Sequence, residues 1–379
     1  MPHMVHIGLN AHLLSSQPGY RTAGIHNVIH QLLNRLPRFA PPDWQFTAMV
    51  GSQNFAEYPN MSMQRATLDT EAPIKRILWE QGIQPFQLGE YDLLHAMAFV
   101  APFLLRKPLV VTVYDLTFMR YPQRLTTARR LYLRLFTALT CQRARRITVI
   151  SHSTKHDLVD LLGIDPGKID VTHLGYDRDV FKPLPESAIR AFREKKGLPE
   201  RFWLYLGTLE PRKNLVTLIE AYAQLPANER LPLILAGGKG WMTGAIFEAV
   251  ERAGLSQEIL FPGFIPAEEM AFWYNSAEVF FFPSVFEGFG LPPLEAMACG
   301  TPVVTTNVSS LPEVVEGAGI CLSPDAIMEW TETLNRVYHD SAWREAARQA
   351  GFAKAQQFSW ENTAQQTIAS YQQALASWK

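Results

Sequence analysis

The stretch VFFFPSVFEGFGLPPLEAMACGTPVVTT, residues 279–306, carries the densest structural signal in the chain. Its apolar start predicts a buried strand that ends at Ser284, and a helix should begin near Pro292, because proline is favoured in the first turn. Gly288 and Gly290 allow positive φ and a close backbone approach in the loop between them. Free N–H groups at the helix start make an anion site. The stretch predicts a strand–loop–helix unit that binds a ligand, although an ordinary solvent loop before a helix has the same pattern.

Apolar runs of the same kind recur through both halves of the chain. They cover 5–10, 45–51, 92–98, 109–115, 146–152, 169–175, 202–208, 231–238, 258–264, 279–284, 301–307 and 319–323. Helical patterns lie between them, over 23–36, 214–225, 268–277 and 327–340. Near-continuous apolar runs are typical of strands that are covered on both faces of a parallel sheet. The alternation therefore predicts an α/β protein with two Rossmann-like, doubly wound domains.

The segment 175–187 has the chemistry of a linker, with two prolines and five charged residues after the sixth predicted strand. We predict an N-terminal domain over 1–180 and a C-terminal domain over 181–359. The last segment, 360–379, is an expected amphipathic helix that packs back on the N-terminal domain. Its apolar face should hold Trp360, Thr367, Ile368 and Tyr371.

Composition excludes several classes of protein. A net charge of -1 argues against a general nucleic-acid binder. The cysteines, Cys141, Cys299 and Cys321, form no C-x-x-C pair, so we expect reduced thiols and neither disulfides nor a zinc site. The N-terminus lacks the features of a signal peptide, and the longest apolar run, 96–105, is too short to span a membrane. We expect a cytoplasmic protein that is soluble or peripheral on the inner face of the plasma membrane.

A second strand–loop–helix signal is LYLGTLEPRKNLVTLIEAY, residues 204–222. Arg212 and Lys213 come just before the expected helix, and Asn214 is a natural N-cap. Paired cations at a helix start suit a diphosphate, because arginine binds oxygens with a fork and lysine supplies a point charge. A surface loop with two solvated cations is the alternative.

Two carboxylates of the first stretch, Glu287 and Glu295, are separated by seven residues, so both can face one site from different heights. Carboxylates are good acceptors for the vicinal hydroxyls of a sugar or a ribose. The sequence Asp177-Arg178-Asp179 matches a D-x-D metal motif, but it lies in the expected linker, and we interpret it as structural. We expect no metal and no cofactor.

Taken together, these motifs resemble glycosyltransferase family 4, the retaining enzymes of GT-B fold, almost from end to end. The matching segments are RILWEQ (76–81), DLLHAMA (92–98), VVTVYDLTF (110–118), ITVISHSTKHDL (147–158), HLGYDRDVF (173–181), GTLEPRKN (207–214), FPGFIPAEEM (261–270), FEGFGLPPLEAMACGTPVV (286–304) and SSLPEV (309–314). The segment with E-x-F-G-L-x-x-x-E spacing and G-T-P-V-V is highly specific. GTLEPRKN resembles a mannosyltransferase-like subgroup.

The resemblance implies that the C-terminal domain binds a nucleotide sugar and the N-terminal domain binds the acceptor. Arg212 and Lys213 would lie at the donor pyrophosphate, and Glu287 would contact the hydroxyls of the donor sugar. The remaining donor contacts implied by the family are Gly24, Gly207, Phe264, Ile265, Gly288, Phe289, Gly290, Leu291 and Glu295. Of these, Phe264 and Ile265 would flank the base, and Glu295 would hold the ribose.

His95 matches the family histidine at the reacting sugar, and Asp115 matches the acid of a family His–Asp pair. The sequence departs from the family at two positions: Tyr114 replaces the expected histidine, and Thr208 replaces an arginine that Arg212 would have to substitute. These departures leave open how Asp115 and Arg212 act.

The resemblance implies front-face transfer of a hexose with retention of the anomeric configuration. The expected donor is GDP-mannose, with UDP-glucose as the second candidate. The expected acceptor is a glycan or a lipid-linked acceptor in surface polysaccharide or glycolipid biosynthesis. A nucleotide-sugar epimerase or a non-catalytic nucleotide-sugar-binding subunit are the alternatives. A dehydrogenase is disfavoured, because no G-x-G-x-x-G follows the first strand. The segment 129–146 is basic, with leucines and aromatics at helical spacing. We favour a solvated surface helix there, with contact to an anionic membrane as the alternative.

Overall fold

The computed structural model describes residues 4–14, 24–52, 57–68, 70, 72–121 and 126–378. The chain divides into two compact units. Unit 1 comprises Met1–Gly175 together with Ser359–Lys379, and unit 2 comprises Tyr176–Phe358. The division thus falls five residues before the predicted boundary at 180, and Ser359 belongs to unit 1 rather than to the C-terminal domain.

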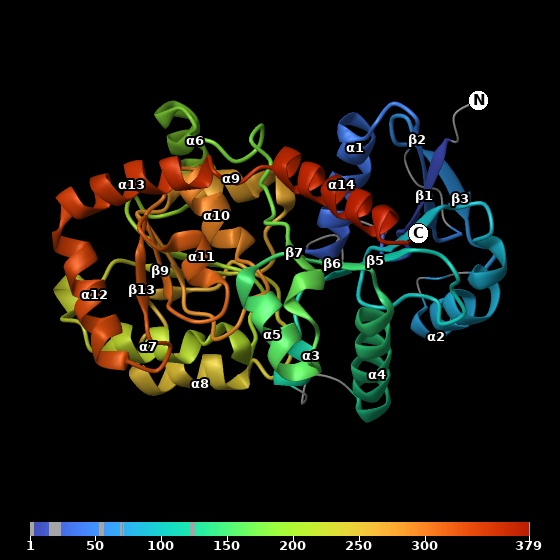
Figure 1. Cartoon of the computed structure of the whole chain (residues 1–379). Helices are drawn as coiled ribbons and strands as arrows, with labels where there is room; N and C mark the ends of the chain where they lie inside the picture. The colour runs from blue at the N-terminus through green and yellow to red at the C-terminus, as the bar shows by residue number, and fades with distance from the viewer. Residues whose placement is uncertain are drawn as a thin grey trace. The chain divides into compact units, whose positions relative to one another are not determined.

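Unit 1 is built on a parallel sheet with the strand order β3-β2-β1-β4-β5-β6-β7 (Figure 1). Its strands are β1 (Val5–Asn10), β2 (Trp44–Val50), β3 (Ser62–Arg65), β4 (Leu93–Ala96), β5 (Leu109–Val113), β6 (Arg146–Val149) and β7 (Ile169–Val171). The order 3-2-1-4-5-6 is that of a doubly wound Rossmann sheet. Strand β3 was not predicted, because SMQR is short, polar and at the edge of the sheet, where no apolar run is required.

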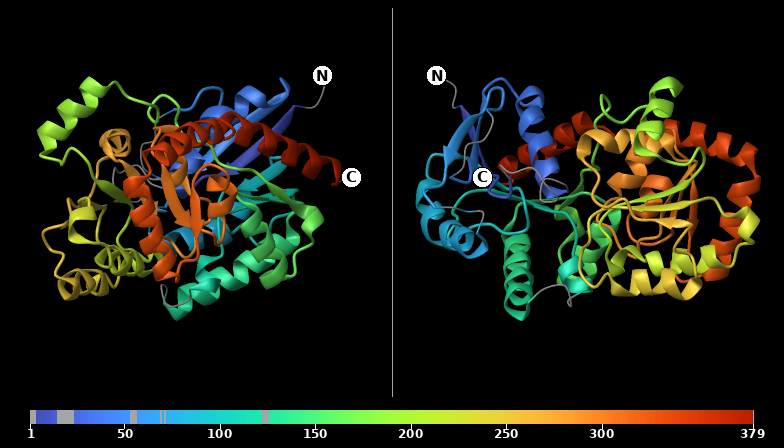
Figure 2. Two further views of the ribbon diagram at one scale, coloured as in Figure 1. Left: turned by 90° about the vertical axis from the view of Figure 1, so that its left-hand side faces the viewer. Right: turned by 180° about the vertical axis from the view of Figure 1, so that it is seen from behind.

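Helices cover both faces of this sheet. They are α1 (Ile25–Phe39), α2 (Pro73–Leu78), α3 (Thr117–Arg120), α4 (Thr127–Arg143), α5 (His152–Leu162) and α14 (Trp360–Ala376), with shorter turns η2 (Trp79–Ile83), η3 (Gln84–Gln87) and η5 (Pro166–Lys168). Figure 2 shows α1 and α14 together on one side of the sheet and α4 on the other. The C-terminal helix therefore crosses back to the N-terminal unit, where it packs on α1, β4, β5 and β6.

Helix α14 buries the face that the sequence predicts. Trp360, Thr367, Ile368 and Tyr371 are all less than 5% exposed, while residues of the opposite face, such as Gln365, are exposed. Gly175 allows the start of this helix to approach the end of unit 1's first segment, because a Cβ there would lie 2.1 Å from the Trp360 nitrogen. The apolar stripe of α14 is therefore part of the core of unit 1.

Unit 2 contains a second parallel sheet, with the order β10-β9-β8-β11-β12-β13. Its strands are β8 (Trp203–Leu206), β9 (Leu233–Ala236), β10 (Ile259–Leu260), β11 (Val279–Phe282), β12 (Val303–Thr306) and β13 (Ile320–Leu322). The four residues of β11 are fully buried, as expected for a central strand that is covered on both faces. The prediction of two Rossmann-like α/β domains is confirmed, and each unit carries one.

The helices of unit 2 again lie on both sides of the sheet, with α7 and α8 on one side and α9 and α10 on the other (Figure 1). They are α6 (Glu186–Lys196), α7 (Leu215–Ala223), α8 (Gly244–Ala253), α9 (Ala267–Ser276), α10 (Leu291–Ala298), α11 (Leu311–Val315), α12 (Ile327–His339) and α13 (Ser341–Ala355), with turns η6 (Pro211–Lys213) and η7 (Ala227–Glu229).

The segment after Gly175 is held by hydrogen bonds to backbone groups. Asp177 Oδ1 accepts hydrogen bonds from the backbone N–H groups of Asp179 (3.0 Å) and Val180 (3.3 Å), so this carboxylate closes a local turn. The Arg178 guanidinium donates to the carbonyl of Gln356 at 2.9 Å. Asp177 and Arg178 are therefore engaged by backbone groups of unit 2.

The three cysteines are free thiols, with Cys141 and Cys299 buried and Cys321 half-buried. Burial raises the pKa of Cys141 to about 12, which disfavours its reactive thiolate form. The expectation of reduced thiols is confirmed. Within the described ranges, no helix is both long enough and apolar enough to cross a bilayer.

Candidate functional site

Two loops of unit 2 meet where β8 and β11 end. The two strands pair directly in the sheet, so the loops that follow their carboxyl ends emerge side by side. The first loop runs through Gly207 into turn η6, and the second runs from Pro283 to Gly290. The backbone N–H of Val285 donates to the carbonyl of Arg212 at 3.0 Å and joins the loops directly.

Glycine is required at the ends of β8 and β9. Gly237 has φ 146°, and a Cβ on it would lie 1.9 Å from the carbonyl oxygen of Gly207. In the second loop the positive φ, 122°, falls on Gly290, the N-cap of α10. The predicted use of positive φ therefore holds for Gly290, whereas no such φ is recorded for Gly288.

Lys213 pairs with Glu287 across the two loops. The distance from Lys213 Nζ to Glu287 Oε1 is 2.6 Å, and the ammonium also lies 4.6 Å from the centre of the Phe282 ring. Lys213 is 7% exposed. Burial lowers its pKa, an effect that the Glu287 charge opposes. The two strand–loop–helix motifs, 204–222 and 279–306, therefore meet at this pair.

Arg212 makes a broader set of contacts. Its Nε and Nη2 donate to Glu210 Oε1 at 3.0 and 2.9 Å, and its Nη1 lies 2.8 Å from Glu287 Oε1. Nη1 also donates to the carbonyl of Phe286. The sequence analysis missed Glu210, which is 4% exposed. Its position two residues before an arginine in a conspicuous motif could have drawn attention to it.

Glu287 is held as a carboxylate. Burial opposes its charge, but Lys213 and Arg212 outweigh burial and lower the pKa of Glu287 to about 2. Its backbone is fixed by the SSLPEV segment: its N–H donates to Ser309 Oγ at 3.0 Å, and Ser310 Oγ donates to its carbonyl at 2.9 Å. Glu287 thus presents a charged oxygen from a loop that is held in place.

Glu295 has the opposite electrostatic environment. It lies in α10, is 8% exposed, and accepts a hydrogen bond from the Tyr274 hydroxyl at 3.2 Å. Burial raises the pKa of Glu295 to about 8, only partly offset by Tyr274. At neutral pH this carboxyl is therefore mostly protonated. The sequence motif, which contains both Glu287 and Glu295, did not reveal this difference. Tyr274 was also missed, because it comes from a helix that the motif does not include.

The other predicted donor contacts of unit 2 differ in exposure. Phe264 is 59% exposed and Ile265 is 8% exposed after β10. Phe289 is buried, with its ring 5.7 Å from that of Phe358, and Leu291 is half-buried at the start of α10. The ring of Phe289 is therefore part of the packing of unit 2, and its contact with a donor stays a prediction.

The predicted cap of α7 is wrong in its detail. Asn214 stands at the N-cap position, but it adopts a left-handed conformation and its side chain accepts no backbone N–H. Its Oδ1 instead accepts from the Thr217 hydroxyl at 2.9 Å, and its Nδ2 donates to the Pro324 carbonyl at 2.7 Å. Asn214 therefore ties the loop to the end of the sheet.

His95, the residue expected at a reacting sugar, is enclosed in unit 1. The residue lies within β4 rather than after it, and it has no exposed surface. Nδ1 is 2.6 Å from the Tyr371 hydroxyl and Nε2 is 2.8 Å from the Thr112 hydroxyl, so both ring nitrogens are engaged. Burial lowers the pKa of His95 to about 3. The imidazole therefore lies between the sheet and α14, and its role at a reacting sugar stays a prediction.

Asp115 and Gly24 also belong to unit 1. Asp115 follows β5 and accepts the backbone N–H of Thr117, the first residue of α3, at 2.8 Å. Its neighbour Tyr114, which stands where the family has a histidine, is buried and donates to the carbonyl of Met97 at 2.9 Å. Gly24 is the N-cap of α1, with φ 69° and open space around its Cβ position.

Both units of the chain match known protein families. A family model described as Glycosyltransferase Family 4 matches residues 23–180, and one described as Glycosyl transferases group 1 matches residues 188–354. The O-antigen chain mannosyltransferase B of Escherichia coli is 34% identical over 292 residues, which cover 76% of this chain and 76% of that protein.

Solved structures share the fold. Sucrose-phosphate synthase from Thermosynechococcus elongatus superposes with a TM-score of 0.78 at 22% identity, over 98% of this chain and 100% of that one. HepE of Anabaena, solved in complex with UDP and glucose, superposes with a TM-score of 0.73 at 21% identity, over 98% and 99%. With both units matched and the relative covered over most of its length, this chain belongs to glycosyltransferase family 4 and has the GT-B fold.

Proposed function

We propose that this glycosyltransferase moves a hexose, with retention of the anomeric configuration, from a nucleoside diphosphate sugar that binds at the Lys213–Glu287 pair. The observation that carries the proposal is this pair of a buried lysine and a half-buried glutamate, 2.6 Å apart, at the carboxyl ends of two adjacent parallel strands. A cation for the diphosphate and an ionised carboxylate for sugar hydroxyls are both present there.

The leaving group needs its growing negative charge stabilised. Lys213 supplies one charge, and backbone N–H groups from Gly288 to Leu291 supply dipoles at the start of α10. Pro292 and Pro293 have no N–H, so the donors of this anion site come from the loop more than from the helix. Since a phosphate oxygen of the leaving group can take the acceptor proton, the reaction needs no protein base and, in this proposal, no metal.

Glu295 is proposed to hold the ribose. A carboxyl with a raised pKa can both donate and accept a hydrogen bond at neutral pH, and a ribose hydroxyl pair offers the complementary groups. Phe264 and Ile265 are proposed to flank the base. Gly24 is proposed to let the first loop of unit 1 approach the phosphates.

GDP-mannose is the proposed donor, because the relative from Escherichia coli is a mannosyltransferase. UDP-glucose is the second candidate, since HepE was solved with UDP and glucose. The proposed acceptor is a glycan or lipid-linked glycan in surface polysaccharide assembly. A thermal-shift screen of GDP-, UDP-, ADP- and dTDP-sugars identifies the donor, because a ligand that binds the native state raises Tm.

The reaction is tested by NMR of products formed from the stabilising donor. We expect an acceptor glycoside with the anomeric configuration of the donor. Lys213→Ala and Glu287→Ala should lower turnover by at least about 100-fold while the circular dichroism spectrum is unchanged. Near-normal turnover in either variant rejects the site. A donor sugar inverted at one carbon, without an acceptor product, would identify an epimerase, and binding without any product would identify a non-catalytic subunit.

A peripheral membrane contact through α4 is proposed as the means of reaching a lipid-linked acceptor. Leu131 and Leu135 are 63% and 51% exposed on this helix, next to the exposed Arg130 and Arg134. Apolar side chains between arginines suit an anionic bilayer surface. This exposure favours the membrane interpretation over a merely solvated basic helix.

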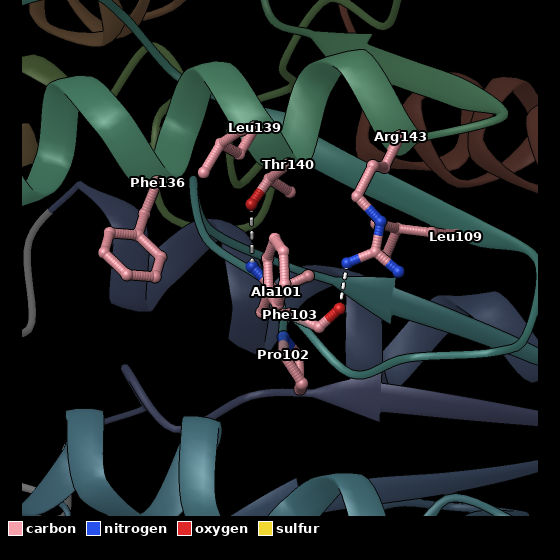
Figure 3. A pocket seen from close by; sticks show the side chains of 8 residues that line it. All are labelled: Ala101, Pro102, Phe103, Leu109, Phe136, Leu139, Thr140 and Arg143. Carbon is pink, nitrogen blue, oxygen red and sulfur yellow. Dashed lines mark hydrogen bonds between the residues drawn. The ribbon is translucent and has the colours of Figure 1, made fainter.

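The loop beside α4 adds to this surface. Phe103 and Leu104 are 51% and 60% exposed. Figure 3 shows how α4 holds the loop: Thr140 accepts the N–H of Ala101 at 3.2 Å, and Arg143 donates to the carbonyl of Phe103. The loop therefore presents its apolar side chains from a fixed backbone.

Flotation with anionic vesicles at low salt tests the contact. The pair Leu131→Gln and Leu135→Gln should reduce vesicle binding by at least about threefold, whereas Leu161→Gln on α5, an exposed leucine elsewhere in unit 1, should leave binding unchanged. Equal binding by all proteins, or no binding by the wild type, contradicts the contact but leaves the transfer reaction untouched.

A further inference from the structure

The two cations of the site differ in how they are held. Arg212 uses Nε, Nη1 and Nη2 within the protein, whereas Lys213 has one carboxylate oxygen and an aromatic face. We propose that Glu210 and Arg212 are positioning residues that tie the two loops together, and that Lys213 is the cation that exchanges Glu287 for the donor diphosphate. This inference rests on the proposed function and assigns different roles to the two cations, Arg212 and Lys213.

Arg212 contacts both loops and can hold them together. Its guanidinium bridges Glu210 in the first loop and both the Glu287 carboxylate and the Phe286 carbonyl in the second. A backbone hydrogen bond, from the Val285 N–H to the Arg212 carbonyl, joins the same two loops. A planar fork with donors pointing in several directions fixes the relative position of its acceptors, which a lysine ammonium cannot do. Moving Arg212 onto a phosphate would break contacts in both loops.

Glu210 explains why Arg212 stays in place. The Glu210 side chain is 5% exposed and takes two N–H groups of the guanidinium on one oxygen. A buried carboxylate that loses its partner cation is left uncompensated, which strongly destabilises the folded protein. The pair is therefore retained when a ligand enters.

Lys213 is suited to an exchange of partners. Its Glu287 contact is a single oxygen, and an ammonium on a flexible stem can turn from a carboxylate to a phosphate oxygen without change of backbone. The four side chains Glu210, Arg212, Lys213 and Glu287 carry two charges of each sign and sum to zero. A diphosphate therefore gains an uncompensated cation only when Glu287 releases Lys213, and the released carboxylate is then available to the sugar hydroxyls.

Charge-balanced double variants separate the two roles. Glu210→Gln with Arg212→Gln removes the tie, and Lys213→Gln with Glu287→Gln removes the exchangeable pair, each without altering net charge. Binding of GDP and of UDP is measured by calorimetry, turnover is measured with the stabilising donor, and thermal unfolding reports whether each variant folds.

We expect the first double variant to bind the nucleotide within about threefold of wild type while kcat falls at least about tenfold. The second double variant should lose at least about tenfold in nucleotide affinity, as expected for a lost charge-assisted contact. Loss of affinity by the first variant equal to that of the second overturns the inference, because Arg212 would then contact the diphosphate. Unchanged kcat in the first variant also overturns it.

The single variant Glu210→Gln keeps the test decisive if the double variant unfolds. Weakening the hold on Arg212 should lower kcat and leave nucleotide affinity equal to or above that of wild type; a decrease of affinity as large as that of Lys213→Gln refutes the positioning role. Failure of the wild type to bind GDP or UDP and to form product would instead reject the proposed function itself.

Discussion

Glu287 and Glu295 show how far the surroundings decide the chemistry of one residue type. Two cations lower the pKa of Glu287 to about 2, whereas burial raises that of Glu295 to about 8. The first is an obligate acceptor at neutral pH, and the second can donate a hydrogen bond. A sequence motif records both as glutamates and cannot distinguish them, since the distinction comes from Lys213, Arg212 and the burial of α10.

The raised pKa of Glu295 makes a prediction about stability. The folded protein holds this proton up to about pH 8, while an unfolded glutamate releases it near its ordinary pKa of 4.5. Stability should therefore fall as pH rises between these values, since the unfolded state loses the proton first. Glu295→Gln removes this dependence.

We expect the Tm of Glu295→Gln to fall less than that of wild type between pH 6 and pH 9. The difference should be at least about 3 °C, the effect of about 1 kcal/mol on a domain of this size. Glu251→Gln, on the exposed face of α8, is the control and should follow the wild type. Parallel curves for wild type and Glu295→Gln would show that Glu295 is ionised in the folded protein.

Site residues could be predicted from the sequence where a local motif alone fixes their position. Lys213, Glu287 and Gly290 were found because a loop between a strand and a helix fixes their place along the chain. Glu210 and Tyr274 were not, since their partners are set by tertiary packing. The burial of His95 could not be predicted either, because it depends on α14, which lies more than 260 residues later in the sequence.

At the scale of elements, the prediction of strands succeeded because buried parallel strands need continuous apolar runs, such as the VFFF of β11. Edge strands have no such need, which is why β3 was missed. Boundaries were less accurate: the runs predicted over 169–175 and 258–264 extend well beyond β7 and β10, because apolar residues such as Leu174 and Phe261 lie in the loops that follow these strands.

The close approach of β8 and β9 predicts a strict requirement for glycine. Gly237→Ala would place a Cβ 1.9 Å from the Gly207 carbonyl oxygen at a φ of 146°. We expect it to lower the free energy of unfolding by at least about 2 kcal/mol, as overpacking and backbone strain combine. Its neighbour Gly238 has nothing within 4 Å of its Cβ position, so Gly238→Ala should change stability by less than about 0.5 kcal/mol. Urea titration measures both, and equal stability of the two variants would contradict the packing described at this strand end.

Helix α14 is joined to the sheet of unit 1 by a buried polar contact. Tyr371→Phe removes the hydroxyl that lies 2.6 Å from His95 Nδ1 and leaves that nitrogen without this partner. The free energy of unfolding should fall by about 1–2 kcal/mol, the cost of a lost buried hydrogen bond. Gln372→Ala on the exposed side of α14 is the matched control. An unchanged stability for Tyr371→Phe would mean that the hydroxyl contributes nothing to holding the helix.

At the scale of the whole molecule, two Rossmann-like units divide the proposed functions. Unit 2 contains the charged cluster that is proposed to bind the donor, and unit 1 carries the exposed apolar and basic side chains of α4. The chain crosses between the units at Gly175 and again at Ser359. Linker composition indicated the first crossing to within a few residues, and the amphipathic pattern of α14 indicated the second.

A crystal structure with the stabilising nucleotide sugar tests most directly whether the Lys213–Glu287 pair is the donor site. We predict that Lys213 Nζ leaves Glu287 and lies within hydrogen-bonding distance, about 3 Å, of a diphosphate oxygen, while Glu287 accepts from a sugar hydroxyl. A donor bound elsewhere, with the 2.6 Å contact between Lys213 and Glu287 intact, would contradict the account.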